Sequence, residues 1–362
     1  MSTSEMTRAA MSQPNEPEAK AAPQPAQGKA AVRKNRVART VVWMSLAMVL
    51  TIAAYLFWGR DRLPAVEVLQ VLGGQKVPGA SFIIMSDRLP RVAVGALAGA
   101  GLGISGALFQ RWLGNPLASP DVIGVGYGAS AAAVLAMITL GYTDWKLNAF
   151  ALAGGLVVAA LIYWLSASGK RTGPRLILAG LAIGAMLQAL IQYLLTQAEV
   201  NTASDVMHWL TGSLSSSNWN SALILLITLG ALGALLLPFV LRQLKMLELG
   251  EGSAAALGVN VPWARVLLVF VAVAMGAVPI AITGPLAFVA FLAGPISAAL
   301  SRGPINIPLA GLTGATLVIV ANFFAANLFA ETALPVGVIT GAFGAPFLIW
   351  ILVRANSTGN GA

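Results

Sequence analysis

The chain has 362 residues, of which 57% are hydrophobic and only 10% are charged. Soluble globular proteins carry roughly 25% charged residues, so this composition excludes an ordinary soluble fold and indicates an integral membrane protein. The absence of cysteine excludes a disulfide framework and a thiolate metal site. The net charge of +9 does not indicate a nucleic-acid-binding protein, because the basic residues lie mostly between apolar stretches, as in membrane proteins.

The chain begins with a compositionally distinct segment. Residues 1–40 are rich in Ala, Pro, Gln and charge and would bury little surface, so we expect a disordered cytosolic tail. Uncharged stretches long enough to cross a bilayer then recur along the chain. They cover residues 41–59, 92–110, 122–143, 147–169, 176–198, 209–241, 266–301, 303–330 and 332–353. This pattern predicts an all-α membrane domain at 41–354 and a short cytosolic tail at 355–362.

Two of these stretches do not correspond to one span each. The stretch 209–241 starts with polar residues and is expected to span only from about Ala222. The stretch 266–301 would measure about 54 Å as one helix, against a hydrocarbon core of about 30 Å. Pro279 and the Gly284-Pro285 pair are expected to break it into two short spans. The total is then about ten transmembrane helices.

Lysine and arginine predict the orientation. If the N-terminus is inside, sixteen of the 22 Lys and Arg residues fall in inside segments and six fall outside. Basic residues prefer the cytoplasmic side, so both termini are expected in the cytosol and the protein in the cytoplasmic membrane.

The predicted spans contain no Asp, Glu, Lys, Arg or His. Ion-coupled carriers and pumps generally place ionisable groups at membrane depth, and an intramembrane enzyme needs a cluster of catalytic groups there. Both classes are therefore disfavoured. A passive pore, or a transporter driven by a separate protein, fits the pattern better.

A glycine-rich stretch lies in the second span. Gly101-Leu102-Gly103-Ile104-Ser105-Gly106 matches a dinucleotide-binding fingerprint, but that motif requires a strand before it and a βαβ unit. The better interpretation is helix packing. Gly95, Gly99 and Gly103, at a spacing of four, would form a smooth face for close approach of another helix in lipid.

Two segments between spans carry candidate interaction residues. On the inside, Glu251, Ala254, Leu257 and Gly258 suggest a short helix with a small apolar face and a glycine stop, although a plain surface helix is equally compatible. On the outside, Arg88-Leu89-Pro90-Arg91 precedes the second span. These arginines either anchor lipid headgroups or bind an acidic partner.

Three other features have simpler interpretations. The lone histidine, His208, and the tryptophans Trp209 and Trp219 are expected to be interfacial residues. Ser119-Pro120-Asp121 has the composition of a helix start, with a capping serine and an acidic residue near the positive helix end.

Together these motifs resemble the FecCD-type permeases, the membrane subunits of ATP-driven importers for ferric siderophores, haem and cobalamin. The resemblance runs from about Arg88 to Arg354. Its landmarks are Arg88-Leu89-Pro90-Arg91, Ser105 to Gln110, Asn115-Pro116-Leu117-Ala118, Arg175 to Gly180, Trp209 with Gly212-Ser213, Leu249-Gly250-Glu251 with Leu257-Gly258, Gly284 with Phe288-Val289, Leu334 to Val338 with Thr340, and Gly344 to Phe347.

The resemblance implies a ten-helix permease fold of the type II ABC importers and import of a ferric siderophore, with cobalamin or haem as the alternative cargo. It implies cytosolic ABC ATPases that couple through Glu251, Ala254, Leu257 and Gly258. It also implies an external substrate-binding protein that docks on Arg88 and Arg91. The chain has no Gly-x-x-x-x-Gly-Lys-Ser/Thr loop, so we expect it to bind no cofactor, with ATP and Mg used by the ATPase.

The sequence departs from the family pattern at three places. Members often continue from Phe-Val with Gly-Leu, then Pro-His and an arginine, where this chain has Ala290-Phe291, Gly294-Pro295 and Ala298. An acidic residue before Leu-Pro is replaced by Ala333, and an arginine near the ninth span by Ala326 and Asn327. The first departure favours a pair with a different permease over a homodimer. A secondary carrier or channel is the less favoured function.

Overall fold

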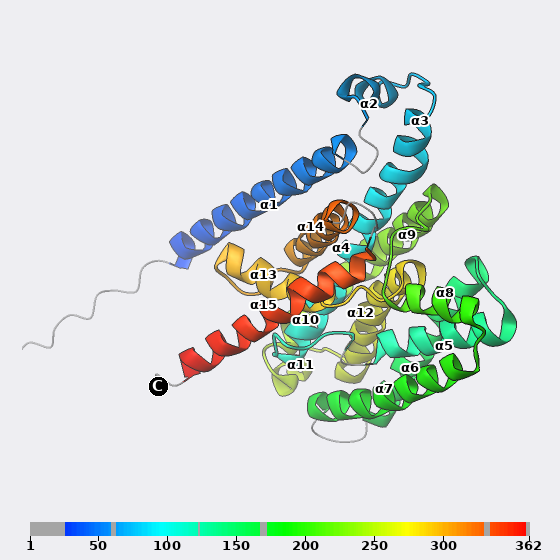
Figure 1. Cartoon of the computed structure of the whole chain (residues 1–362). Helices are drawn as coiled ribbons and strands as arrows, with labels where there is room; N and C mark the ends of the chain where they lie inside the picture. The colour runs from blue at the N-terminus through cyan, green and yellow to red at the C-terminus, as the bar shows by residue number, and fades with distance from the viewer. Residues whose placement is uncertain (1–25, 59–62, 122–123, 167–171, 329–333, 360–362) are drawn as a thin grey trace, which may run out of the picture.

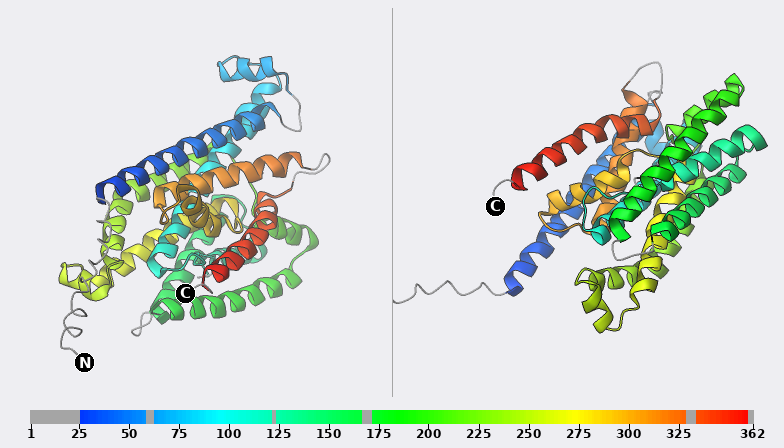
Figure 2. Two further views of the ribbon diagram at one scale, coloured as in Figure 1. Left: turned by 90° about the vertical axis from the view of Figure 1, so that its left-hand side faces the viewer. Right: turned by 90° about the horizontal axis from the view of Figure 1, so that it is seen from below.

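The computed structural model describes residues 26–58, 63–121, 124–166, 172–328 and 334–359. Helices and turns make up this part of the chain, and it contains no β-strand. The helices pack as an elongated bundle in which α1 and α15 lie on one flank and α5, α6 and α7 on the opposite flank (Figures 1 and 2). In chain order the elements are α1 (Ala26–Phe57), α2 (Ala65–Leu72), α3 (Ala80–Phe82), the π-helix η1 (Ile83–Arg88), α4 (Leu89–Leu113), α5 (Val125–Leu140), α6 (Trp145–Ser166), α7 (Thr172–Gln197), α8 (Val200–Leu210), α9 (Trp219–Ala231), the π-helix η2 (Leu232–Leu236), α10 (Leu237–Leu247), α11 (Glu251–Ala256), α12 (Val261–Thr283), α13 (Val289–Ser301), α14 (Ile307–Asn327) and α15 (Val336–Gly359).

The predicted number of spans agrees with these helices. Among the described residues, seven helices are long and apolar enough to cross a membrane, and three shorter apolar helices, at Val125–Leu140, Val289–Ser301 and Val336–Ile349, bring the total to ten. The helix ends gather at two opposite faces. We call the face with α11 and the C-terminal end of α4 the α11 face, and the face with α2, α8 and Gly284 the α8 face.

Several predicted boundaries were wrong. The first helix begins at Ala26, so residues 26–40 of the predicted disordered tail are helical, while residues 1–25 lie outside the described residues. The last helix continues to Gly359, which leaves only residues 360–362 of the predicted C-terminal tail outside the description. Hydropathy marks the apolar middle of a span and gives no information on how far its polar ends remain helical.

The predicted break in residues 266–301 is present, but only one of its two expected causes acts. Helix α12 ends at Thr283, and Gly284 takes a φ of 69°, which a glycine adopts without strain. Pro279 does not break the helix and lies buried inside α12. Its carbonyl accepts a hydrogen bond from the Thr283 hydroxyl at 3.0 Å, which keeps the last turn closed.

Helix α4 is the centre of the bundle. It packs against α14, α12, α13 and α9, and most of its residues are buried (Figure 1). Glycines permit this crowding on three sides. A side chain added at Gly99 or Gly103 would meet the backbone of α14, at Gly101 that of α12, and at Gly106 that of α13. Gly95 instead faces the side chains of Leu214 and Val318. The glycines predicted for helix packing therefore lie at the α4–α14 contact.

Prolines near helix starts coincide with the two π-helical segments. Leu89 N–H donates to Ile84 O just before Pro90, and Leu237 N–H donates to Leu232 O just before Pro238. A proline ring clashes with the carbonyl of the preceding turn, and one extra residue in that turn relieves the clash. A residue that precedes a proline usually leaves helical geometry, but Leu89 does not. Leu89 has φ −65° and ψ −44°, and the helix runs through.

Gly99 offers a direct test of the close packing. Gly99→Ala places a methyl group against the Gly314 carbonyl, and overpacking of this kind costs roughly 1–3 kcal/mol. Gly230→Ala in α9 is the matched control, because no atom lies within 4 Å of the added group. We expect thermal unfolding in detergent at a lower temperature for Gly99→Ala and an unchanged or higher one for Gly230→Ala. Equal unfolding temperatures for the two variants would contradict the packing role of Gly99.

Candidate functional site

The segment between α10 and α12 forms a short helix at the α11 face. Gly250 precedes α11 with φ 96° and ψ 149°, a conformation that is essentially confined to glycine. Gly258 follows the helix with φ 82°. A side chain at either position would meet no atom within 4 Å, so these glycines are required by the backbone and not by crowding. The expected glycine stop at Gly258 is therefore present.

The two apolar residues of this segment do not share one face. Ala254 is completely buried against the bundle, whereas Leu257 is 60% exposed at the end of the helix. The expected small apolar face formed by both residues was therefore wrong. One residue seats the helix on the bundle, and the other presents apolar surface to the outside.

Two ion pairs hold the segment that contains α11. The Arg111 guanidinium at the end of α4 donates from Nε and Nη2 to the two carboxylate oxygens of Glu248, at 2.8 and 2.7 Å. On the other side of Gly250, Glu251 pairs with Arg265 of α12. Sequence analysis missed both pairs. Arg111 and Glu248 are 137 residues apart, and no periodicity in the sequence connects them.

Three segments with motif residues converge at the α8 face. Ser213 N–H donates to Thr283 O at 2.8 Å, and Gly337 N–H donates to Gly212 O at 3.0 Å. A side chain on Gly212, Gly284 or Gly337 would strike a neighbouring backbone in this junction. The segments that follow α8 and α12 and the start of α15 are thus joined by direct backbone contacts.

Arg88 is not displayed on the surface as predicted. Its side chain is buried, with the residue 4% exposed, and Nη1 donates to Leu56 O at 2.6 Å. Leu56 is in the last turn of α1, where carbonyl groups lack intrahelical donors and a cation is favourable. Arg88 therefore ties the end of α1 to the start of α4. The π-helix η1 continues the helix on the N-terminal side of Pro90, and in this geometry the Arg88 side chain points toward the end of α1.

Arg91 remains partly accessible at the same face. Its side chain is 23% exposed and pairs with Asp87, one turn earlier, at 2.6 Å. Trp219 lies nearby and donates its indole N–H to Met85 O at 2.7 Å. That carbonyl would face Pro90 in the π-helical pattern, and Pro90 has no N–H to offer. Trp219, expected to be a plain interfacial aromatic, thus satisfies a backbone group of η1.

Other candidate residues have local roles. His208 Nε2 lies 3.2 Å from the Ser215 hydroxyl, with no metal-binding group of three or more His, Asp or Glu found among the described residues. Helix α5 begins only at Val125, with Gly124 as its cap, so Ser119 and Asp121 do not form the expected helix start. Burial raises the pKa of Asp121 to about 6. Because the folded protein favours the protonated carboxyl of Asp121, the free energy of unfolding is higher in acid. This extra stability is lost as the pH rises through about 6.

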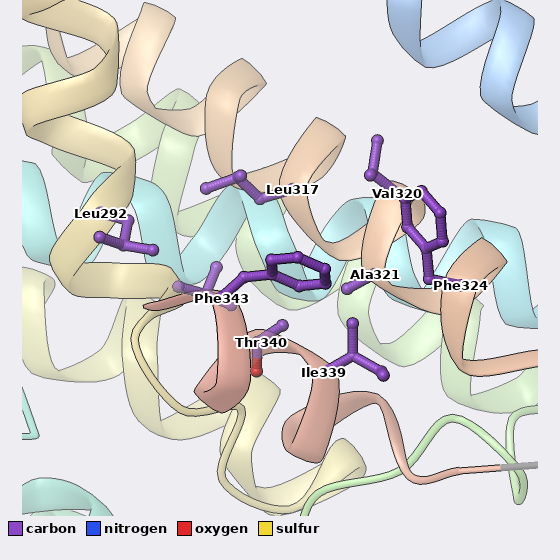
Figure 3. A pocket seen from close by; sticks show the side chains of 9 residues that line it. Leu292, Leu317, Val320, Ala321, Phe324, Ile339, Thr340 and Phe343 are labelled. Carbon is purple, nitrogen blue, oxygen red and sulfur yellow. The ribbon is translucent and has the colours of Figure 1, made fainter. Parts of the chain in front are cut away.

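A cavity of about 190 Å³ lies between α13, α14 and α15 (Figure 3). Its walls are apolar, with Leu292, Leu317 and Phe324 on two helices and Phe343 pointing across it from the third. The one hydroxyl in its lining, that of Thr340, donates to Gly337 O at 3.1 Å. The cavity offers shape and apolar contact, and its lining provides no acid, base or metal ligand.

The whole arrangement can be compared with known proteins. The family model described as the FecCD transport family matches residues 46–354. The chain belongs to the FecCD transport family. It is 35% identical to the achromobactin transport system permease protein of Dickeya dadantii over 87% of this chain and 92% of the relative. It is also 35% identical to the ferric enterobactin transport system permease protein of Escherichia coli, over 82% of this chain and 90% of that protein.

A solved structure shows the same fold. An inward-facing conformation of a metal-chelate type ABC transporter matches with a TM-score of 0.77 and 27% identity, over 87% of this chain and 99% of that chain. The expected permease fold is therefore confirmed. As a FecCD permease, the chain is a multi-pass protein of the cytoplasmic membrane that works with ATPase and permease partners.

Proposed function

We propose that this permease forms half of a pathway that imports a ferric siderophore across the cytoplasmic membrane. The observation that carries the proposal is the family match over residues 46–354, together with relatives named for achromobactin and ferric enterobactin. The described chain also lacks a metal-binding cluster. A chelate that already encloses its iron requires no metal ligand from the permease. Haem or cobalamin is the alternative cargo.

The proposed orientation places the α11 face in the cytosol, with both termini on that side. The basic residues of the helix segments toward this face are Arg111, Arg242, Lys245, Arg265 and Arg302. Basic residues concentrate in cytoplasmic segments. In this orientation α11 faces the ATPase and Arg91 faces the outside.

The proposed energy source is a separate ATPase, which binds ATP and Mg, while this chain binds no cofactor. Charged side chains of the long helices lie toward their ends, and the middle of each described span has none. A pathway lined by small, apolar and uncharged polar residues would release a polar chelate quickly, because strong charge pairing would retain it.

Vesicles test this function directly. The permease is reconstituted with its partner subunits, and uptake of iron-labelled ferric enterobactin, haem and cobalamin is measured with and without ATP. We expect ATP-dependent uptake of the ferric siderophore alone. Uptake without ATP would identify a passive pore, uptake driven by an ion gradient would identify a carrier, and uptake of only haem or cobalamin would overturn the siderophore assignment.

The permease partner is proposed to be a different subunit. The support is the departure at Gly294-Pro295 and Ala298, where a chain that builds both halves would be expected to keep the standard residues. Isolation of an active transporter that contains only this permease and its ATPase would refute the proposal.

Coupling to the ATPase is proposed to act through Glu251, Ala254, Leu257 and Gly258. The exposed Leu257 gives the ATPase an apolar contact, and Gly258 sets the direction in which the chain leaves α11. Gly258→Val forces a β-branched residue into a φ of 82° and should uncouple ATP hydrolysis from uptake without preventing insertion.

Gly252→Val is the matched control for Gly258→Val. It places the same side chain in equally open space inside α11 without a positive φ. The measurement is the amount of cargo transported for each ATP hydrolysed. The coupling assignment fails if Gly258→Val transports with the normal ratio.

Docking of an external binding protein is proposed to use Arg91, with Arg88 in a structural role. Arginine binds carboxylates through two parallel hydrogen bonds, and charged residues at the edge of an interface mainly control association rate and salt dependence. Arg91→Ala should therefore slow docking, most strongly at low salt. Arg88→Ala should instead lower stability by about 1–3 kcal/mol, because it leaves Leu56 O without its donor.

Both variants are measured by association kinetics at two salt concentrations and by thermal unfolding. Asp87→Asn, which removes the partner of Arg91 and keeps the arginine, should dock at least as fast as the unchanged protein. If Arg91→Ala docks at the normal rate in low salt, this arginine only anchors the membrane surface.

A further inference from the structure

We propose that Arg111 and Glu248 form a strut that makes α4 follow the movement of α11, so that the pair positions the core of the permease during ATP-driven transport. This inference rests on the proposed coupling of an ATPase through α11. It adds a connection through which movement of α11 reaches α4. It also assigns a positioning role to Arg111 and Glu248, which no sequence motif had indicated.

The geometry of the pair suits a mechanical connection. Both hydrogen bonds run between the planar guanidinium and the planar carboxylate, which fixes orientation as well as distance. The side chains are 22% and 36% exposed, so the pair contributes little to folding stability on its own. Its proposed contribution is therefore the connection that it makes between α4 and the loop before α11.

The strut joins a segment with few other attachments to the best-anchored helix. Helix α11 has six residues, and the residue it buries is Ala254. Glu248 lies just before Gly250, whose backbone conformation gives the segment a sharp turn. Arg111 lies in the last turn of α4, before the left-handed cap at Gly114. A displacement of the loop thus acts on the end of α4 without passing through the length of α10.

The second ion pair completes the attachment. Glu251 at the first turn of α11 binds Arg265 of α12, the helix that packs beside α4. The two pairs lie on opposite sides of Gly250 and reach two neighbouring core helices. Movement of α11 would therefore shift α4 and α12 together, whereas the covalent chain alone would connect α11 to α10 and α12.

Single and reversed substitutions test the strut. Arg111→Ala and Glu248→Ala should each reduce cargo transported per ATP hydrolysed by at least about threefold, a typical size for a coupling residue. Both should insert normally and retain ATPase activity. The charge reversal Arg111→Glu with Glu248→Arg should restore most of the ratio. Arg242→Gln, at an exposed arginine of α10 on the same face, is the control and should change nothing.

A distance measurement separates this inference from the proposed function. The chain has no cysteine, so spin labels attach only at Leu257→Cys on α11 and Phe82→Cys at the far end of the continuous helix that contains α4. Both positions are exposed. We expect a narrow distance distribution in the permease alone, broadening in either alanine variant and narrowing again in the charge reversal.

The two measurements fail in different ways. If the unchanged transporter shows no ATP-dependent uptake, the proposed function fails, and the label distances still report whether the strut holds α11 to α4. If the two alanine variants and the charge reversal have the same label distances and the same transport ratio as the unchanged protein and Arg242→Gln, the strut is wrong, whatever the cargo. Loss of folded protein in the alanine variants, without rescue by the reversal, would also overturn it.

Discussion

The fold depends on direct contact between the backbone of α4 and the backbones of its neighbours. In lipid, apolar side chains gain little by leaving their surroundings, so helices associate through van der Waals packing and hydrogen bonds. Glycines on three sides of α4 remove the side chains that would keep α14, α12 and α13 apart. The Ser105 hydroxyl donates to Ala272 O at 2.5 Å within one of these contacts. Because α4 is crowded on all these sides, it has little room to bend and can act as a rigid rod.

Prolines supply the second constraint, because each removes a backbone hydrogen-bond donor from its helix. Pro295 leaves Phe291 O without its usual partner in α13, and Gln110 of α4 donates to that carbonyl at 2.9 Å. A side chain at Gly294 would meet the same glutamine amide. Gly294-Pro295 and Gln110 therefore act together: Gly294 leaves room for the Gln110 side chain, which donates to the carbonyl that Pro295 leaves without a donor. Trp219 does the same for Met85 O before Pro90.

Hydropathy was sufficient to predict the spans and their number, since a bilayer demands long apolar helices. It could not predict details that depend on distant partners. Pro279 was expected to break α12, yet the helix continues through it to Thr283. Arg88 was expected at the surface, yet the extra residue in η1 turns it toward Leu56 O. The spacing of Gly99 and Gly103 indicated close packing, but only the structure shows that α14 is the partner. The ion pairs around α11 join residues with no common sequence pattern.

As a result of these constraints, one continuous helix connects the two faces of the bundle. Residues 80–113 run without a break from the α8 face to the α11 face, because η1 carries the helix past Pro90. Arg88 and Arg91 lie near one end and Arg111 at the other. In the proposed coupling, an event at either face acts on this one helix, which packs closely against α14, α12 and α13 along its middle. In the proposed coupling, this helix transmits displacement only through the segments attached to its ends. Arg88 attaches one end to α1, and Arg111 attaches the other end to the loop before α11.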